Sequence, residues 1–87
     1  MRVDYHSNFK KQFKKLPKSI QDKFYLRLKV FLDNPFASEL NNHALKGRYR
    51  ECRSINVTGD MRTVYSMKEG KDIIVFLLIG SHSELYG

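Results

Sequence analysis

The chain has 87 residues, of which 16 are Lys or Arg and 9 are Asp or Glu, so its formal net charge is +7. This length predicts a single domain over residues 1–87, and no apolar run is long enough to predict a membrane span or a signal segment. The charge favours RNA, DNA, an anionic membrane surface or an acidic protein as partner. The single Cys52 has no disulfide partner within the chain, so we expect a protein of the reducing cytoplasm.

The N-terminal part of the sequence predicts a short strand followed by two helices. Apolar and polar residues alternate over the first five positions, which is typical of a strand. An amphipathic helix is expected next, with Ser7 or Asn8 as its cap and Pro17 as the residue that interrupts it. A second amphipathic helix should cover residues 18–33, because Pro35 prevents it from continuing.

The C-terminal part of the sequence predicts three strands after a loop over residues 36–47. Gly59 is expected to provide an unusual backbone angle in the first turn between them. The last strand is apolar on both faces, so we place it in the interior of the sheet. The predicted strands cover residues 48–57, 61–67 and 72–79, and the predicted turns cover 58–60 and 68–71.

This order of elements, β-α-α-β-β-β, predicts an α+β domain. A helical hairpin with one apolar face should pack on one side of a small, mostly antiparallel sheet.

Basic side chains gather around the first of these strands. Only two acids, Glu51 and Asp60, lie nearby, so the arginines outnumber their possible partners. They are either solvated or form an unpaired cluster that binds phosphate through bidentate guanidinium groups, and we favour the second reading. Periodicity leaves open which face of the strand points to the helices. The candidate phosphate-binding residues are Lys46, Arg48, Arg50, Arg53 and Arg62.

Two histidines are candidates for proton transfer. His82 directly follows the apolar strand, and Tyr86 comes one helical turn later; His43 lies in the predicted loop. Histidine is the side chain best suited to exchange protons near neutral pH. His6 is expected to cap or cover the first helix. No Gly-rich phosphate loop is present, and the histidines lack ligand spacing, so we expect neither a metal nor another cofactor.

Three segments resemble the RelE/YoeB/YafQ superfamily of bacterial toxins, most closely its YafQ-type branch. The resemblance spans nearly the whole chain, and the terminal motif and the His-x-Leu-x-Gly segment are fairly specific. The lysine-rich opening of residues 9–16 is typical as well. The segments are Asn-His-Ala-Leu-Lys-Gly-Arg-Tyr-Arg-Glu-Cys-Arg at 42–53, Asp-Met-Arg-Thr-Val-Tyr at 60–65 and Gly-Ser-His-Ser-Glu-Leu-Tyr at 80–86.

The resemblance implies the toxin of a type II toxin–antitoxin module with a RelE-like fold, similar to small microbial ribonucleases. Such toxins cut mRNA in the ribosomal A site, where the ribose 2′-OH attacks the adjacent phosphate without a metal. An acidic antitoxin is the implied protein partner, and mRNA and the ribosome are the implied targets. Arg53 stands where YafQ-type members can carry a second histidine. Positions matched to functional ones are His43, Asp60, Arg62, His82 and Tyr86.

The reaction implied by this resemblance needs a base for the 2′-OH, an acid for the leaving 5′-oxygen and a cation for the phosphorane. We expect Arg62 and Arg53 to stabilise the charge. His82 is the preferred acid or base with His43 or Asp60 as its partner, and which does which stays open.

Tyr86 could stack on a base or position the phosphate. Two alternative functions remain: a ParE-like inhibitor of DNA gyrase, and a non-catalytic module that binds RNA or the ribosome.

Overall fold

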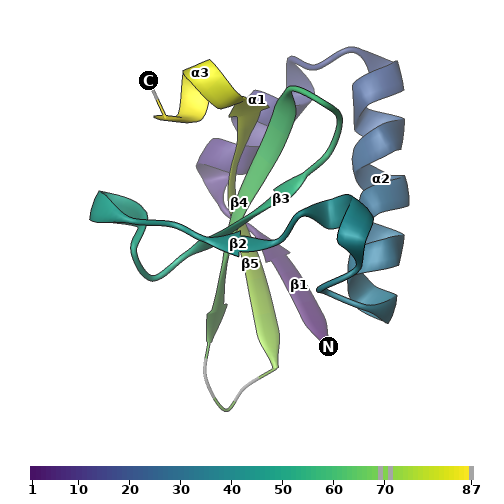
Figure 1. The fold of residues 1–87 in the computed structure, drawn as a ribbon. Coiled ribbons are helices and arrows are strands. Elements are labelled where there is room, and N and C mark those ends of the chain that lie inside the picture. The colour runs from purple at the N-terminus through teal and green to yellow at the C-terminus, as the bar shows by residue number, and fades with distance from the viewer. Residues whose placement is uncertain (69, 71, 87) are drawn as a thin grey trace.

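The computed structural model describes residues 1–68, 70 and 72–86. It contains a five-stranded sheet with two helices, α1 and α2, on one side (Figure 1). Along the chain the elements are β1 (Arg2–Tyr5), α1 (Ser7–Lys14), α2 (Lys18–Asp33), the 3-10 helix η1 (Ser38–Leu40), β2 (His43–Ala44), the 3-10 helix η2 (Gly47–Tyr49), β3 (Arg53–Asn56), β4 (Met61–Lys68), β5 (Ile73–Ser81) and α3 (His82–Tyr86).

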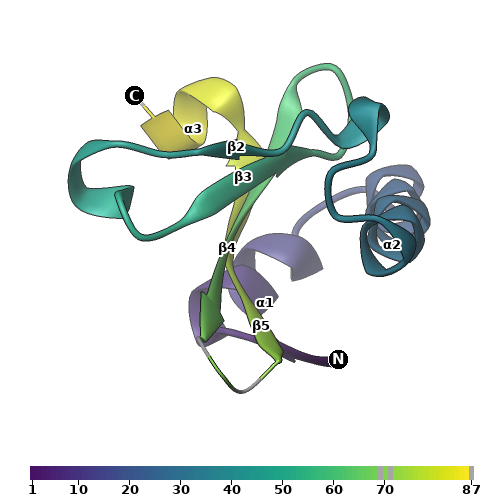
Figure 2. The same cartoon turned by 60° about the horizontal axis from the view of Figure 1, so that its bottom comes forward.

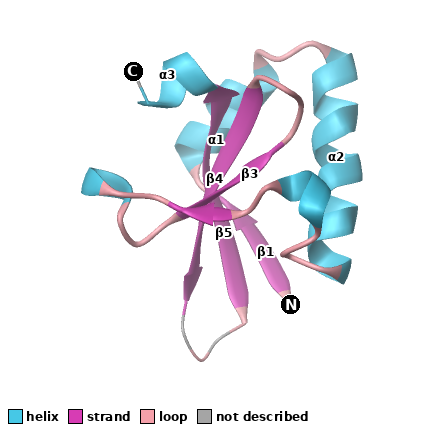
Figure 3. Ribbon diagram, in the orientation of Figure 1, coloured by secondary structure: helices cyan, strands magenta, loops and turns pink. Residues whose placement is uncertain are grey.

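The strands lie in the order β1-β5-β4-β3-β2. Strand β1 pairs with β5 in parallel, and the other neighbours are antiparallel. The most apolar strand, β5, therefore has a partner on each side, as predicted. Figure 3 shows α2 at the right of the sheet and α1 behind its strands, with α3 apart from them at the upper left. The predicted α+β architecture, with a helical hairpin on a mostly antiparallel sheet, is confirmed.

An aromatic core lies between the helices and one face of the sheet. Phe76 of β5 sits at its centre, with ring centroids 5.4 Å from Phe24 of α2 and 5.9 Å from Phe9 of α1. The Gln12 side chain of α1 accepts the backbone N–H of Ile79 at 2.9 Å, beyond an irregularity in the β4–β5 register. These contacts fix the helices on the sheet, and β5 is the strand on which the site below depends.

Helix α3 lies on the other side of the sheet. Ile79 belongs to the core, whereas a Cβ built on the next residue, Gly80, would lie 3.3 Å from Leu85 Cδ2 of α3. Adjacent residues of a strand point to opposite faces, so α3 packs on the face away from the core. In Figure 2, α3 is accordingly seen across β4 and β5 from α1. We call this second side the open face of the sheet.

The segment before β3 differs most from the prediction. His43 and Ala44 form a two-residue strand where a loop was expected, and residues 48–52 are not a strand. Gly47 has a φ of 68°, which turns the chain into the short helix η2. The strand therefore begins only at Arg53.

Two local predictions were also wrong. The cap of α1 is His6, whose Nδ1 accepts the Asn8 N–H at 3.1 Å, so neither Ser7 nor Asn8 caps the helix. The turn before β4 does not use Gly59, because the glycines with positive φ among the described residues are Gly47 and Gly70. A side-chain bond holds that turn instead, since Thr58 Oγ1 accepts the N–H of Met61 at 3.0 Å.

The predicted loop at 68–71 lies partly outside the described residues, which omit 69 and 71. Strand β4 extends through Lys68 and β5 starts at Ile73.

Candidate functional site

Four of the five candidate catalytic residues gather at one end of the β4–β5 hairpin. Arg62 of β4 is directly opposite Gly80 of β5, and Met61 is opposite Ser81. The backbone N–H of His82 donates to the backbone oxygen of Asp60 at 3.1 Å. Residues 60–62 and the start of α3 are therefore adjacent although they are 20 residues apart in the chain.

His82 and Tyr86 form one unit on α3. Both stand on the same side of the helix because they are four residues apart, and their ring centroids are 4.9 Å apart. His82 is exposed, whereas Tyr86 is half-buried. This contact holds an accessible imidazole against an aromatic ring.

Helix α3 is attached to the sheet by two side chains. Leu85 is only 5% exposed and packs toward Gly80. The Glu84 carboxylate accepts the backbone N–H of Ser81 at 2.8 Å, and this bond together with the Ser81 side chain lowers the pKa of Glu84. Glu84 therefore keeps its charge and closes the first turn of α3.

Arg62 holds the turn that precedes β4. Its Nη1 donates to three backbone oxygens, those of Thr58 at 3.0 Å, Gly59 at 2.9 Å and Met61 at 3.2 Å. This nitrogen carries two of the five N–H donors of a guanidinium, so three donors take no part in these bonds. Arg62 is thus a rigid, oriented cation rather than a freely solvated one.

The sheet register separates Arg53 from Arg62. Arg62 pairs with Gly80, whose neighbour is α3, so it belongs to the open face. Arg53 pairs with the core residue Tyr65 and belongs to the face that the helices cover. Periodicity had left these faces open, and the structure shows that the two arginines do not share one.

Arg53 is instead part of a hydrogen-bonded network. Its Nε donates to Asn42 Oδ1 at 2.6 Å, and Asn42 Nδ2 donates to Tyr65 Oη at 2.7 Å and to the Pro35 oxygen at 2.9 Å. Burial raises the pKa of Tyr65, and the bond from Asn42 and the charge of Arg53 oppose that rise. The guanidinium also lies 5.3 Å from the ring centroid of Phe36. The network anchors Asn42, the residue before β2, to the rest of the sheet.

His43 lies on the open face but away from the hairpin end. His43 pairs with Ser54 of β3, which in turn pairs with Val64 of β4, two residues along that strand from Arg62. The backbones of His43 and Arg62 are therefore about 12 Å apart. The side chain is exposed, and Nδ1 is 2.9 Å from the Asn41 carbonyl oxygen. A carbonyl can only accept, so Nδ1 carries the proton and Nε2 is left as the acceptor of the neutral ring.

The remaining basic candidates lie on the tip of the β2–β3 hairpin, residues 45–52. The Leu45 N–H closes this tip by donating to the Cys52 oxygen at 3.1 Å. The tip exposes three cations, Lys46, Arg48 and Arg50. The Arg48 guanidinium carbon is 5.0 Å from the ring centroid of Tyr49, a residue that is not among the candidates predicted from sequence.

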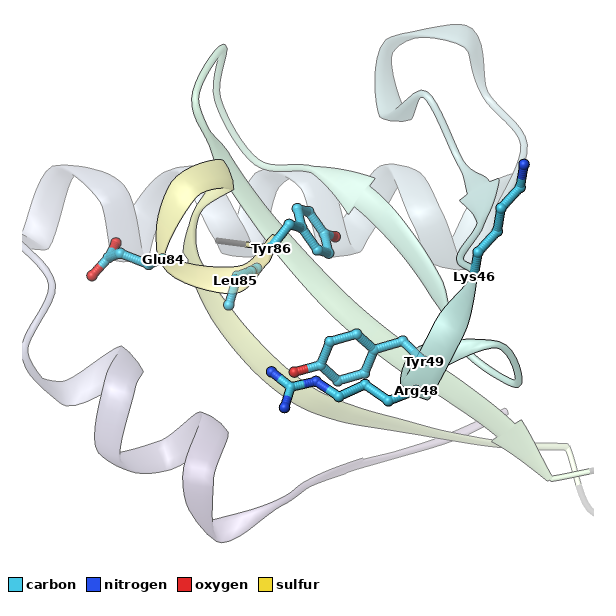
Figure 4. A pocket seen from close by; sticks show the side chains of 6 residues that line it. All are labelled: Lys46, Arg48, Tyr49, Glu84, Leu85 and Tyr86. Carbon is cyan, nitrogen blue, oxygen red and sulfur yellow. The ribbon is translucent and has the colours of Figure 1, made fainter.

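A cavity of about 390 Å³ lies between this tip and α3 (Figure 4). Arg48 and Tyr49 extend toward α3, and Tyr86 lies across from them. Because the ring of Tyr86 also contacts His82, the cavity adjoins the cluster at the hairpin end. The residues that line it are Lys46, Arg48, Tyr49, Glu84, Leu85 and Tyr86.

Two structural features are absent from the described part of the chain, a metal-ligand cluster and a membrane-spanning helix. No three side chains of His, Cys, Asp or Glu gather there as a metal site would require. None of the helices there is both long and apolar enough to cross a bilayer.

Comparisons with known proteins agree with this architecture. A family model described as the bacterial toxin of type II toxin–antitoxin systems, YafQ, matches residues 1–87. No curated protein matches the sequence.

Several solved structures are similar. YafQ from Escherichia coli BL21(DE3) has a TM-score of 0.82 at 21% identity over 100% of both chains. A copper-bound mutant toxin from Helicobacter pylori has a TM-score of 0.73 at 27% identity over 99% of both chains. The E. coli DinJ–YafQ toxin–antitoxin complex has a TM-score of 0.78 at 20% identity, covering 98% of this chain and 96% of that one.

Proposed function

Since the family model covers it from end to end, this chain belongs to the YafQ family of toxins of bacterial type II toxin–antitoxin systems, and we propose that it is an endoribonuclease that cuts mRNA in the ribosomal A site. The ribose 2′-OH attacks the adjacent phosphate, and the 5′-oxygen of the next nucleotide leaves. The step breaks one P–O bond and forms another, so it needs proton transfer and charge stabilisation but no redox partner. We propose that it proceeds without a metal.

The observation that carries the proposal is the placement of His82. The imidazole is exposed, follows an interior strand directly and is held against Tyr86 at 4.9 Å. A group that transfers a proton has to be both accessible and fixed in position. Histidine is also the side chain best suited to exchange protons near neutral pH.

The neighbours of His82 supply the other functions that the reaction needs. Arg62 lies at the hairpin end, opposite Gly80, and is held by three backbone oxygens, and a cation fixed in this way suits the stabilisation of a phosphorane. Asp60 is joined to His82 by a backbone bond, which supports it as the second proton-transfer group. His43 lies farther away with Nε2 free to accept, so it remains the alternative to Asp60.

We also propose an acidic antitoxin as the protein partner. The E. coli YafQ structures include complexes with DinJ. The formal charge of +7 favours a partner rich in carboxylates, which would bind the arginines of the hairpin tip and block RNA.

Replacement of His82 tests the catalytic proposal. His82→Gln keeps a hydrogen-bonding side chain but cannot transfer the proton, so cleavage of mRNA in programmed ribosomes should slow by about 100–10,000-fold. Binding to the ribosome should stay nearly unchanged, because the arginines are intact. The assay includes a chelator followed by enough Mg²⁺ to keep ribosomes assembled.

The control is His6→Gln, which changes a histidine at the start of α1 and should cut at the parent rate. His82→Gln cutting at the parent rate would exclude His82 as the proton carrier. If the variant stops translation without cutting, the protein acts by binding. A parent protein that leaves mRNA intact but blocks DNA gyrase would be ParE-like instead.

A further inference from the structure

The cavity between the β2–β3 tip and α3 has the composition of a nucleotide-binding site. Its volume of about 390 Å³ is at the lower end of the roughly 300–1,000 Å³ that small-ligand sites occupy. Its walls offer two aromatic rings, Tyr49 and Tyr86, and two cations, Lys46 and Arg48. Aromatic rings bind bases by stacking, and lysine and arginine bind phosphate, so these side chains match both parts of a nucleotide.

The carboxylate in the lining does not oppose an anion at the centre of the cavity. Glu84 is committed to the backbone N–H of Ser81 at 2.8 Å and is directed away from Tyr49 in Figure 4. The charge that the cavity presents is therefore positive.

Tyr49 forms the flat wall. The guanidinium of Arg48 lies over its ring, 5.0 Å from the centroid, so the tip carries a planar cation stacked on an aromatic ring. Tyr49 is half-buried, and it also lines a second hollow formed with Leu77 and Leu78 of β5. Tyr49 therefore borders both the cavity and this hollow beside β5.

Tyr86 links the cavity to the chemistry. Its ring lines the cavity and also contacts His82 at 4.9 Å. Its hydroxyl is buried and has no hydrogen-bond partner among the described residues, so the ring rather than the hydroxyl forms the wall. The ring of Tyr86 would therefore separate a group in the cavity from the imidazole of His82.

We infer that this cavity binds the base of a nucleotide next to the cut phosphate, stacked on Tyr49, with Lys46 and Arg48 on the RNA backbone. The inference rests on the proposed function for its substrate class and names the part of that substrate that the cavity holds. Stacking accepts any base because every base has a π-face. The cavity therefore contributes affinity for RNA and aligns the RNA with the hairpin end, whereas His82 carries out the proton transfer.

Binding of a short single-stranded DNA, used as an uncleavable analogue of the RNA substrate, to the isolated protein tests this without requiring cleavage. The probe is a fluorescent tetranucleotide with 2′-deoxyribose throughout, which cannot undergo the cut, and the measurement is fluorescence anisotropy. Tyr49→Leu keeps an apolar side chain at the hollow that Leu77 and Leu78 also line, but it removes the aromatic face. It should weaken binding by about 5- to 150-fold, whereas Tyr49→Phe should bind like the parent.

The second arm replaces single nucleotides of the probe by abasic ones. At the position that occupies the cavity, the abasic probe should bind the parent weakly, and Tyr49→Leu should weaken it no further. Tyr25→Leu is the matched control, because Tyr25 is an exposed tyrosine of α2 outside the cavity, and it should bind normally.

Three outcomes would overturn the inference. Tyr49→Leu could bind like the parent, or it could lose the same factor in affinity with the intact probe and with every abasic probe. The parent could also fail to bind the probe at millimolar concentration. Cleavage by ribosome-bound protein tests the proposed function separately, since His82→Gln should still bind the probe.

Discussion

At the scale of single residues, Arg62 holds a turn and is also the cation that we propose for the reaction. Its three bonds to the oxygens of Thr58, Gly59 and Met61 hold the turn before β4, and three of its N–H donors take no part in these bonds. A lysine has one compact charge and could not reproduce this geometry. The structural and the chemical task can be separated by comparing Arg62 with another arginine that holds the same turn region.

Arg62→Ala should slow cleavage by roughly 100-fold or more, the scale for losing one well-placed donor. It should also lower the free energy of unfolding by about 1 kcal/mol, since the turn loses its side-chain bonds. Arg27 of α2 is the matched control, because its Nε donates to the Val57 oxygen at 3.3 Å from the helix side.

Arg27→Ala should lower the free energy of unfolding by a similar amount while cleavage stays near the parent rate. Ribosome assays and urea unfolding measure the two quantities. Equal loss of cleavage in both variants would mean that Arg62 acts only through the fold of the turn.

At the scale of elements, the five-residue helix α3 carries both His82 and Tyr86 and depends on few contacts. A helix of this length is not stable by itself. It is held by the buried Leu85 and by the bond between Glu84 and Ser81. The accuracy with which His82 is positioned therefore depends on a side chain that takes no part in the reaction.

Leu85→Ala should release α3 from the sheet. Cleavage should fall by roughly 100-fold, because small displacements of a catalytic group are costly. Hydrogen exchange should show loss of protection in α3 with protection of β5 retained.

Leu40→Ala removes the same atoms from the main core, where Leu40 is 0% exposed, and serves as the control. It should lower the free energy of unfolding by about 2–5 kcal/mol without a selective change in α3. Undiminished cleavage by Leu85→Ala would show that α3 is held by other means.

The elements also show what the sequence could and could not predict. Helix α2 has a long periodic pattern between two prolines, and β5 is a continuous apolar run that follows directly on a turn. The pairing of Asp60 with His82 follows from a β4–β5 hairpin whose ends must meet. These features are local in sequence or follow from one antiparallel pairing, so they could be predicted.

The β2–β3 tip could not be predicted in the same way. A two-residue strand has no period, and η2 depends on the positive φ of Gly47. The face of Arg53 follows from its pairing with Tyr65, and alternation alone does not fix a register. Tyr49 was visible between Arg48 and Arg50, but its role depends on α3 lying opposite, which only the tertiary structure shows.

At the scale of the whole molecule, the excess of positive charge affects both proposed partners. RNA and an acidic antitoxin would be attracted to the same cations of the hairpin tip, so the two should compete. Expression in bacteria should stop growth, and co-expression of the antitoxin encoded beside this chain should restore it.

His82→Gln is the control and should be harmless at equal expression. Growth curves, with the soluble protein quantified, are the measurement. A folded, soluble and abundant parent protein that leaves growth unaffected would contradict the toxic activity.

The parallel pairing of β1 with β5 has a consequence for how the protein is made. Arg2 of β1 is paired with Ile73 of β5. The sheet therefore joins a segment that is synthesised early to one that is synthesised late. At a usual rate of 5–20 residues per second, β1 waits roughly 4–14 s for its partner. His82 follows β5 and comes later still. The site therefore cannot assemble before β5 and α3 have been synthesised, although α1 and α2 are complete much earlier.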